Sequence, residues 1–276
     1  MNPGTEVDPC PGKFRPLRGV WRLFVLLSTA IQGCVQFAAL RIVGNPSISE
    51  RARWLHTSCS KALRRLGIDT IADGKFPSHG LLVANHLSYL DILVFSGLSP
   101  CVFVSKKEVR SWPLFGQMAS MGGTVFIDRS RSTDTHRAKN EMTDALSEGA
   151  VVVLFPEGTS SDGSTVLPFR PALFEAAVKA DADVSSASIT YDVEDGSPGS
   201  DVCYWGSMTF FPHLLRLLSR RKIRARVRFS PDIMKFEDRK LAAQTTQEIV
   251  TSLASARRKA GDAIPECGWQ SAESTG

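Results

Sequence analysis

Hydrophobic positions along the chain fall into short strand-like runs separated by longer amphipathic stretches. The strand-like runs are Ile68–Ala72, Leu81–Ala84, Cys101–Val104, Thr124–Ile127, Val151–Phe155, Val184–Tyr191, Val202–Trp205 and Ile223–Phe229. Helical stretches between them include Tyr89–Leu98, Thr133–Glu148 and Leu173–Ala180. This alternation predicts an α/β fold: a mixed, mostly parallel sheet flanked by helices. The first four residues of Val151–Phe155 are all aliphatic, as expected of a central strand.

An apolar stretch near the N-terminus predicts association with a membrane. Leu23–Leu40 holds 18 residues without a charge, slightly short of the roughly 20 that a spanning helix needs. Basic residues lie on both sides, so charge gives no orientation. We expect a helix, or a bent helix pair, lying in one leaflet on the cytosolic face (the inner membrane if the protein is bacterial). A single span and a buried helix of a soluble protein remain alternatives.

These patterns divide the chain of 276 residues into four parts. Residues 1–12 are rich in Pro, Gly and acidic side chains and are expected to form a disordered lead-in. Residues 13–65 form the membrane-associated helical segment, residues 66–254 the α/β domain, and residues 255–276 a mobile tail. One domain with an extension suits this length.

Composition narrows the range of partners only slightly. The net charge is +5 and the pI is about 9.0, which suits a partner with phosphate groups, such as anionic lipid, an acyl carrier or nucleic acid. Aromatic residues follow strand spacing instead of alternating with Lys and Arg, so we expect no nucleic acid. The six cysteines include no C-x-x-C pair, which favours reduced thiols and no metal site.

A histidine and an aspartate follow the strand-like run Leu81–Ala84. His86 lies just past the end of this run, at the edge where open α/β sheets bind ligands, and Asp91 comes five residues later. A carboxylate that accepts a hydrogen bond from Nδ1 would leave Nε2 free to take a proton from a hydroxyl group. Ser88 and Asp91 also fit a helix capping box, and the two interpretations are compatible.

Further polar residues follow other strand-like runs. Lys106 and Lys107 come after Cys101–Val104, Arg129 after Thr124–Ile127, and Glu157, Gly158 and Thr159 after Val151–Phe155. Arginine and lysine bind phosphate, and backbone N–H groups in a turn with Gly158 can face an anion. Parallel strands would bring these ends to one rim. Each feature taken alone also fits a surface charge or an ordinary turn.

Three motifs in this order resemble the glycerolipid acyltransferase family, which includes the lysophosphatidic acid acyltransferases. Its N-H-x-x-x-x-D, G-x-x-F-I-x-R and F-P-E-G-T blocks match Asn85 to Asp91, Gly123 to Arg129 and Phe155 to Thr159. The resemblance spans about residues 65–230, and Trp205–His213 is similar to a stretch in bacterial members. The family's fourth block departs, because Val184–Ile189 contains no proline and Ala172 stands where glycine is usual.

The resemblance implies direct acyl transfer from acyl-CoA or acyl carrier protein to lysophosphatidic acid, which makes phosphatidic acid without a cofactor. It implies that His86 is the base, that Asp91 orients it, and that Arg129, Glu157, Gly158 and Thr159 bind the acceptor, with help from Lys106 or Lys107. Alternatives are another acceptor, such as a lyso-ornithine lipid or another lysophospholipid, an inactive lipid-binding relative, and a hydrolase.

Overall fold

The computed structural model describes residues 14–112, 114–128 and 132–259. In this part of the chain, strands form one sheet in the order β1-β7-β6-β2-β5-β3-β4. They are β1 (Ile68–Asp73), β2 (Gly80–Ala84), β3 (Val102–Lys106), β4 (Val125–Ile127), β5 (Val151–Leu154), β6 (Val184–Val193) and β7 (Ile223–Met234). Strands β6, β2, β5, β3 and β4 are parallel, and β7 runs antiparallel to β6. The predicted mixed, mostly parallel sheet is confirmed.

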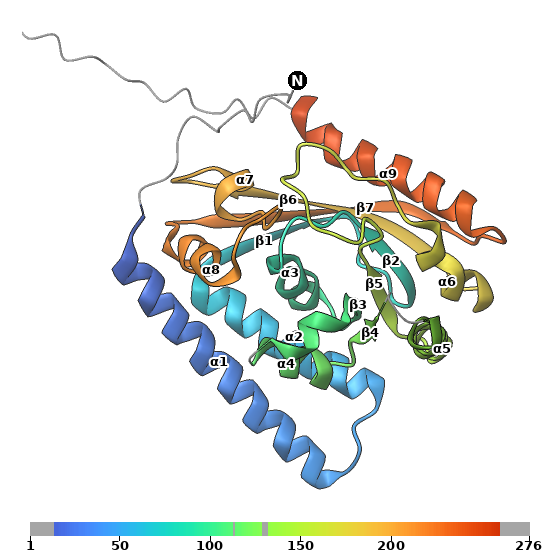
Figure 1. Ribbon diagram of the computed structural model, residues 1–276, viewed down its shortest axis with the longest axis horizontal. Coiled ribbons are helices and arrows are strands. Elements are labelled where there is room, and N and C mark those ends of the chain that lie inside the picture. The colour runs from blue at the N-terminus through green and yellow to red at the C-terminus, as the bar shows by residue number, and fades with distance from the viewer. Residues whose placement is uncertain (1–13, 113, 129–131, 260–276) are drawn as a thin grey trace, which may run out of the picture.

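Helices cover both faces of the sheet (Figure 1). They are α1 (Pro16–Val43), α2 (Ile48–Leu66), α3 (Leu90–Leu98), α4 (Phe115–Met121), α5 (Ser132–Ser147), α6 (Glu175–Lys179), α7 (Pro198–Asp201), α8 (Phe210–Ser219) and α9 (Arg239–Lys259), with short 3-10 turns η1 (Lys107–Ser111) and η2 (Pro171–Phe174). Helix α9 lies on one side of the sheet, and α1, α2, α3 and α8 lie on the other (Figure 1).

Two apolar cores result from this layering. One lies between the sheet and α2, α3 and α8, and includes Trp54, Phe95 and Leu217. The other lies between the sheet and α5, α6 and α9, and includes Phe174 and Val250. Because β2 and β5 are buried along their whole length, both of their faces need apolar residues, which explains their uninterrupted hydrophobic sequences.

The N-terminal segment folds into two helices, α1 and α2. Ser47 caps α2: its hydroxyl accepts from the backbone N–H of Glu50, and the Glu50 carboxylate accepts from the backbone N–H of Ser47 at 2.7 Å. Trp54 of α2 donates its indole N–H to the carbonyl of Gly33 in α1 at 2.9 Å. At Gly33 an added Cβ would lie 3.0 Å from the Ser58 hydroxyl, so a small residue allows the helices to pack closely.

Two elements differ from the sequence-based expectations. The predicted strand Val202–Trp205 is wrong: backbone N–H groups of Val202 and Cys203 donate to the Pro198 carbonyl and close a turn after α7. Both side chains are buried, and a short apolar run does not distinguish a strand from a buried turn. Helix α9 continues past Ser255 to Lys259, into the segment expected to be a tail, of which residues 260–276 lie outside the described residues.

Candidate active site

Asn85 fixes the turn that carries His86. Its side-chain amide donates to the Ile189 carbonyl at 3.0 Å and accepts from the Ile189 N–H at 2.8 Å. The amide thus continues the pairing of β2 with β6 beyond the end of β2, because it copies the two hydrogen bonds of a backbone peptide group. The backbone at His86 is thereby held beside β6.

His86 and Asp91 form a close, directional pair. The Nδ1 atom of His86 lies 2.8 Å from Oδ2 of Asp91, and the carboxylate is fully buried. The same Oδ2 accepts from the backbone N–H groups of Leu87 and Ser88 at 2.8 and 3.0 Å. A carboxylate acceptor assigns the imidazole proton to Nδ1 and leaves the lone pair on Nε2. The pair can therefore accept a proton from a hydroxyl group.

The alternative capping interpretation is only half correct. The Asp91 carboxylate accepts from the Ser88 N–H, as the acidic residue of a capping box does. However, α3 begins at Leu90, Tyr89 is its N-cap residue, and the buried Ser88 hydroxyl has no hydrogen-bond partner. Asp91 therefore organises the turn through backbone N–H groups, and this same role holds it against His86.

Glu157 lies behind the site and does not line the cavity described below. Its side chain is 3% exposed, and its two carboxylate oxygens accept from the backbone N–H groups of His86 at 2.7 Å and Leu167 at 3.0 Å. Burial raises the pKa of Glu157 to about 7, although both backbone donors favour the charged form. In this structure the carboxylate braces the His86 backbone, which differs from the acceptor contact that the sequence suggested.

The turn after β5 places other predicted residues beside His86. Gly158, with φ of 71°, donates its N–H to the Phe155 carbonyl and, with Thr159, lines the cavity. The Phe155 ring stacks on the His86 imidazole, with ring centres 4.3 Å apart and planes 13° from parallel. Positive φ suits glycine because it has no Cβ. This turn therefore fixes both the orientation of His86 and one wall of the site.

Only some of the predicted cationic residues lie at the cavity. Lys106 lines the same cavity as His86, whereas Lys107 forms an ion pair with Asp128 at 3.1 Å and does not line it. Arg129 lies outside the described residues. Within residues 14–112, 114–128 and 132–259, no three His, Cys, Asp or Glu side chains come together as metal ligands would.

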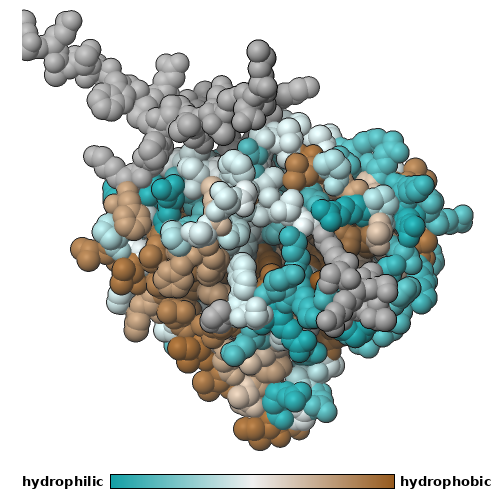
Figure 2. All heavy atoms as spheres, viewed as in Figure 1, coloured by the Kyte–Doolittle hydropathy of each residue, from teal (hydrophilic) through white to brown (hydrophobic). Residues whose placement is uncertain are grey.

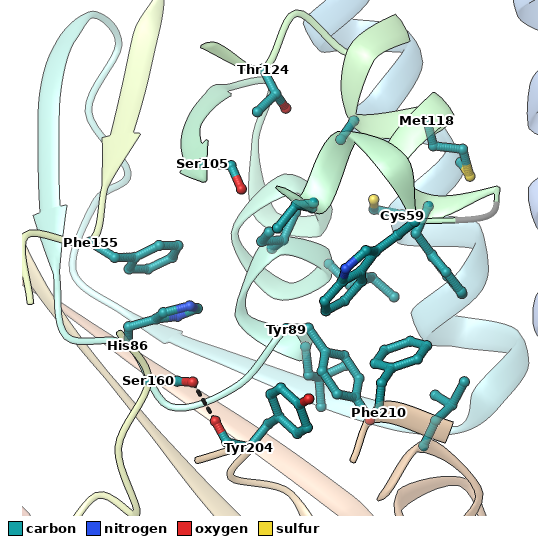
Figure 3. Close-up of a pocket in the computed structure, with 18 of the residues that line it drawn as sticks. Cys59, His86, Tyr89, Ser105, Met118, Thr124, Phe155, Ser160, Tyr204 and Phe210 are labelled. Atoms are coloured by element: carbon teal, nitrogen blue, oxygen red, sulfur yellow. Dashed lines mark hydrogen bonds between the residues drawn. The ribbon is translucent and has the colours of Figure 1, made fainter. Parts of the chain in front are cut away.

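An apolar cavity of about 360 Å³ extends away from His86. Figure 3 shows His86 and Phe155 on one side of it and Cys59 and Met118 on the other. Much of its wall comes from helices α1, α2, α3, α4 and α8, and the rest from strand ends and the loops that follow them. Such a space, with a proton acceptor at one side and mostly aliphatic and aromatic walls elsewhere, suits a hydrocarbon chain whose polar end lies at His86.

An aromatic cluster forms the wall of the cavity nearest α8, and the motifs did not reveal it. The ring centre of Phe210 lies 4.7 Å from that of Trp112 and 5.1 Å from that of Tyr89, and the ring centres of Tyr204 and Tyr89 are 5.5 Å apart. The Tyr89 hydroxyl lies 2.9 Å from Nδ1 of His213. Burial lowers the pKa of His213 to about 4, so this histidine is neutral near pH 7 and adds no charge to the wall.

Comparisons with known proteins identify the class to which this fold and site belong. A family model described as "Acyltransferase" matches residues 69–190. The chain is 38% identical to the lyso-ornithine lipid O-acyltransferase of Brucella abortus, over 63% of this chain and 70% of that one. It is 34% identical to the 1-acyl-sn-glycerol-3-phosphate acyltransferase of Neisseria meningitidis, over 64% and 70%.

A solved structure shares the fold. The 1-acyl-sn-glycerophosphate acyltransferase PlsC of Thermotoga maritima superposes with a TM-score of 0.62 at 19% identity, over 88% of this chain and 98% of that one. The chain belongs to the acyltransferase family and is an enzyme similar to the 1-acyl-sn-glycerol-3-phosphate acyltransferases.

Proposed function

We propose that this enzyme moves a fatty acyl group from acyl-CoA or acyl carrier protein to the free hydroxyl of lysophosphatidic acid, making phosphatidic acid. The observation that carries this proposal is the His86–Asp91 pair, with its 2.8 Å hydrogen bond, beside a cavity with mostly apolar walls. A proton acceptor at such a cavity brings together a hydroxyl nucleophile and a long acyl chain.

The reaction needs only one base. Nε2 of His86 accepts the proton of the acceptor hydroxyl while the oxygen attacks the thioester carbonyl carbon. The tetrahedral intermediate then collapses, the carbon–sulfur bond breaks, and the imidazolium returns the proton to the leaving thiolate. Asp91 holds the Nδ1 proton throughout and offsets the positive charge on the ring. No covalent bond to the enzyme forms.

The cavity supplies the binding energy for the acyl chain. Its walls include Leu26 of α1, Leu55 and Cys59 of α2, Met118 of α4 and Leu214 of α8. Each methylene that leaves water for such a surface contributes about 0.8 kcal/mol. We place the hydrocarbon chain along these walls and the thioester carbonyl beside His86.

The polar rim would take the acceptor's phosphate group. Lys106 supplies a positive charge, and Gly158 and Thr159 line the same cavity. We keep Arg129 as an additional phosphate ligand, as the family motif implies. Glu157, which is buried behind the rim, acts in this proposal by holding the backbone of His86.

Lyso-ornithine lipid is the second candidate acceptor. A relative at 38% identity carries that name, and the aromatic cluster around Phe210 offers ring faces to a headgroup cation such as an ammonium. The chemistry at His86 would be the same, and only the contacts of the headgroup would differ.

Acceptor profiling tests the proposed function. Purified enzyme in mixed micelles is given acyl-CoA or acyl carrier protein thioester, and thiol release is followed with lysophosphatidic acid, with lyso-ornithine lipid and without acceptor. We expect release that depends on lysophosphatidic acid, with phosphatidic acid as the product. Release that depends only on lyso-ornithine lipid would establish the second candidate, and equal release without any acceptor would indicate a hydrolase.

We infer that α1 holds the enzyme on the cytosolic membrane face by lying in one leaflet. The helix has 28 residues and is long and apolar enough to cross a bilayer. One side of it, including Leu26 and Phe37, is buried against the protein, and such packing favours a helix lying along the surface over one surrounded by lipid. Apolar atoms gather over α1 in the lower left of the molecule in Figure 2.

Replacing Trp21 and Phe24 of α1 with serine should weaken membrane binding by at least about tenfold, because each exposed ring contributes roughly 1.5–3 kcal/mol when buried. The two side chains are 65% and 63% exposed and stack on each other. Flotation with anionic phospholipid vesicles measures the bound fraction. Leu241→Ser, at an exposed residue of α9 across the sheet, is the matched control. Equal binding of the double variant and the parent would refute the role of α1.

A further inference from the structure

Tyr191 contacts the His86–Asp91 pair, called the dyad below, from a strand that is distant in sequence. Its hydroxyl donates to Oδ1 of Asp91 at 2.6 Å, the oxygen that His86 does not use. The side chain is 2% exposed. The two oxygens of Asp91 are thus divided between a histidine on one side and a tyrosine on the other.

The register of the sheet explains this placement. Ala84, the last residue of β2, pairs with Ala187 of β6, and β6 continues to Val193. The part of β6 past this pair therefore lies beside the turn that carries His86. Ala187, Ile189 and Tyr191 alternate along β6 and are all buried, as expected for side chains on one face of a strand. Ile189 holds the turn through Asn85, and Tyr191 holds Asp91.

The Tyr191 hydroxyl stays protonated at neutral pH and therefore acts as a hydrogen-bond donor. Burial, the negative charge of Asp91 and their hydrogen bond hold the pKa of Tyr191 well above its ordinary value. A neutral hydroxyl that donates to a carboxylate stabilises the negative charge and lowers the basicity of that carboxylate. A less basic Asp91 attracts the proton on Nδ1 less strongly and stabilises the imidazolium of His86 less.

We propose that Tyr191 is a positioning residue of the acyl transfer reaction, the third member of a Tyr191–Asp91–His86 chain that orients the carboxylate and limits the basicity of the imidazole. This inference rests on the proposed role of His86 as the base. Tyr191 does not line the substrate cavity, and its hydrogen bond to Asp91 is the contact through which we expect it to act.

Other charged or titratable groups near the dyad come from several elements. Glu157 accepts from the His86 backbone N–H, and Lys106 and Tyr89 line the cavity with His86. The thiol of Cys203 lies within electrostatic reach of both Asp91 and Asp162. Burial raises the pKa of both Tyr89 and Cys203, so these two groups stay neutral. Glu157, whose pKa is about 7, titrates in the range where a histidine does, and a rate profile alone would not separate the two groups.

The experiment therefore observes His86 directly. Full-length enzyme with ¹³C-labelled histidine rings is titrated in detergent micelles by NMR, and the His86 signal is assigned by its loss in His86→Gln. In Tyr191→Phe we expect the midpoint of the His86 titration to rise by about 0.5–1 pH unit, because one donor to the carboxylate is lost. The acid limb of the pH profile of kcat should move in the same direction, with KM changed less than about twofold.

Thr246→Val is the matched control, because it removes a buried hydroxyl that bonds within α9. It should lower stability without moving the His86 midpoint. An unchanged midpoint in folded Tyr191→Phe would overturn the proposal and leave Tyr191 as a packing residue. Should Tyr191→Phe not fold, 3-fluorotyrosine at position 191, a stronger donor, should lower the midpoint, and no change would overturn the proposal. A shifted midpoint in an enzyme without transferase activity would instead count against the proposed function.

Discussion

His86→Ala should lower kcat/KM for acyl transfer by roughly 10³–10⁴-fold, the upper part of the range for loss of a general base. Without the imidazole, no group on the described cavity wall offers a neutral nitrogen lone pair beside the acceptor hydroxyl. The variant should keep its fold, because the backbone N–H of residue 86 still donates to Glu157 and the ring is only partly buried. Thiol release under identical micelle conditions measures the loss.

A second histidine provides the control. His79 precedes β2 at the opposite edge of the sheet and pairs with Asp183 at 3.0 Å, so it resembles the dyad in chemistry but lies away from the cavity. His79→Ala should keep activity within about threefold of the parent, as expected of an exposed ion pair. If His86→Ala retained activity comparable with His79→Ala, the acid–base mechanism would be wrong.

Local hydrophobic pattern was sufficient to predict the sheet, and with it the strand ends at or just after which His86, Lys106 and Gly158 lie. Strands β2, β3, β4 and β5 alternate with helices and are parallel, and parallel strands place their carboxyl ends together. The short spacing of His86 and Asp91 allowed their contact to be anticipated. These features depend on residues that are close in sequence or on the direction of the strands. The local order of hydrophobic and polar residues indicates each of these two properties.

Contacts between distant segments could not be predicted in this way. Tyr191 lies 100 residues from Asp91, and their meeting depends on the register of β6 against β2, which no local pattern specifies. The signal that was present is a tyrosine within an apolar strand, because a buried phenol usually needs a hydrogen-bond partner. The segment from Val184 to Ile189, which lacks the family's usual proline, forms the first part of that strand.

The hydrogen-bond partners of Glu157 were not predicted, for a different reason. The motif placed a carboxylate at a strand end facing a possible ligand, but strand direction does not give side-chain direction in the turn that follows. Two backbone N–H groups, from His86 and Leu167, face Glu157. Pairing both removes the cost of burying unpaired donors, roughly 1–3 kcal/mol each. The carboxylate therefore points away from the cavity, toward the two backbone N–H groups that it pairs.

Under the proposed placement, helix α1 would link the membrane and the site. Leu26, Thr29 and Ala30 line the cavity, while Trp21 and Phe24 are exposed on the same helix. If the exposed residues enter a leaflet, the cavity lies next to the bilayer, where the proposed lysophospholipid acceptor would be found. In that arrangement the acyl chain of the acceptor would pass from bilayer to cavity without crossing water, which would cost about 0.8 kcal/mol per methylene.

Asp91→Asn should lower kcat/KM by roughly 10²–10⁴-fold while leaving the fold intact. Three donors converge on Oδ2: the His86 ring N–H and the backbone N–H groups of Leu87 and Ser88. We expect the amide oxygen of asparagine to take this position, since an amide nitrogen there would leave the three donors unpaired. The amide nitrogen then faces Tyr191, whose hydroxyl oxygen can accept.

In this arrangement the tautomer of His86 survives and only the negative charge is lost. The imidazolium that forms as the hydroxyl gives up its proton is then unsupported in a buried setting, where charge interactions are strong. The midpoint of the His86 titration, followed by NMR as for Tyr191→Phe, should move to lower pH, opposite to the shift expected for that variant, because loss of the carboxylate charge disfavours the protonated ring. Activity within about threefold of the parent, or a His86 midpoint that moves upward, would show that the charge of Asp91 does not support His86 during the reaction.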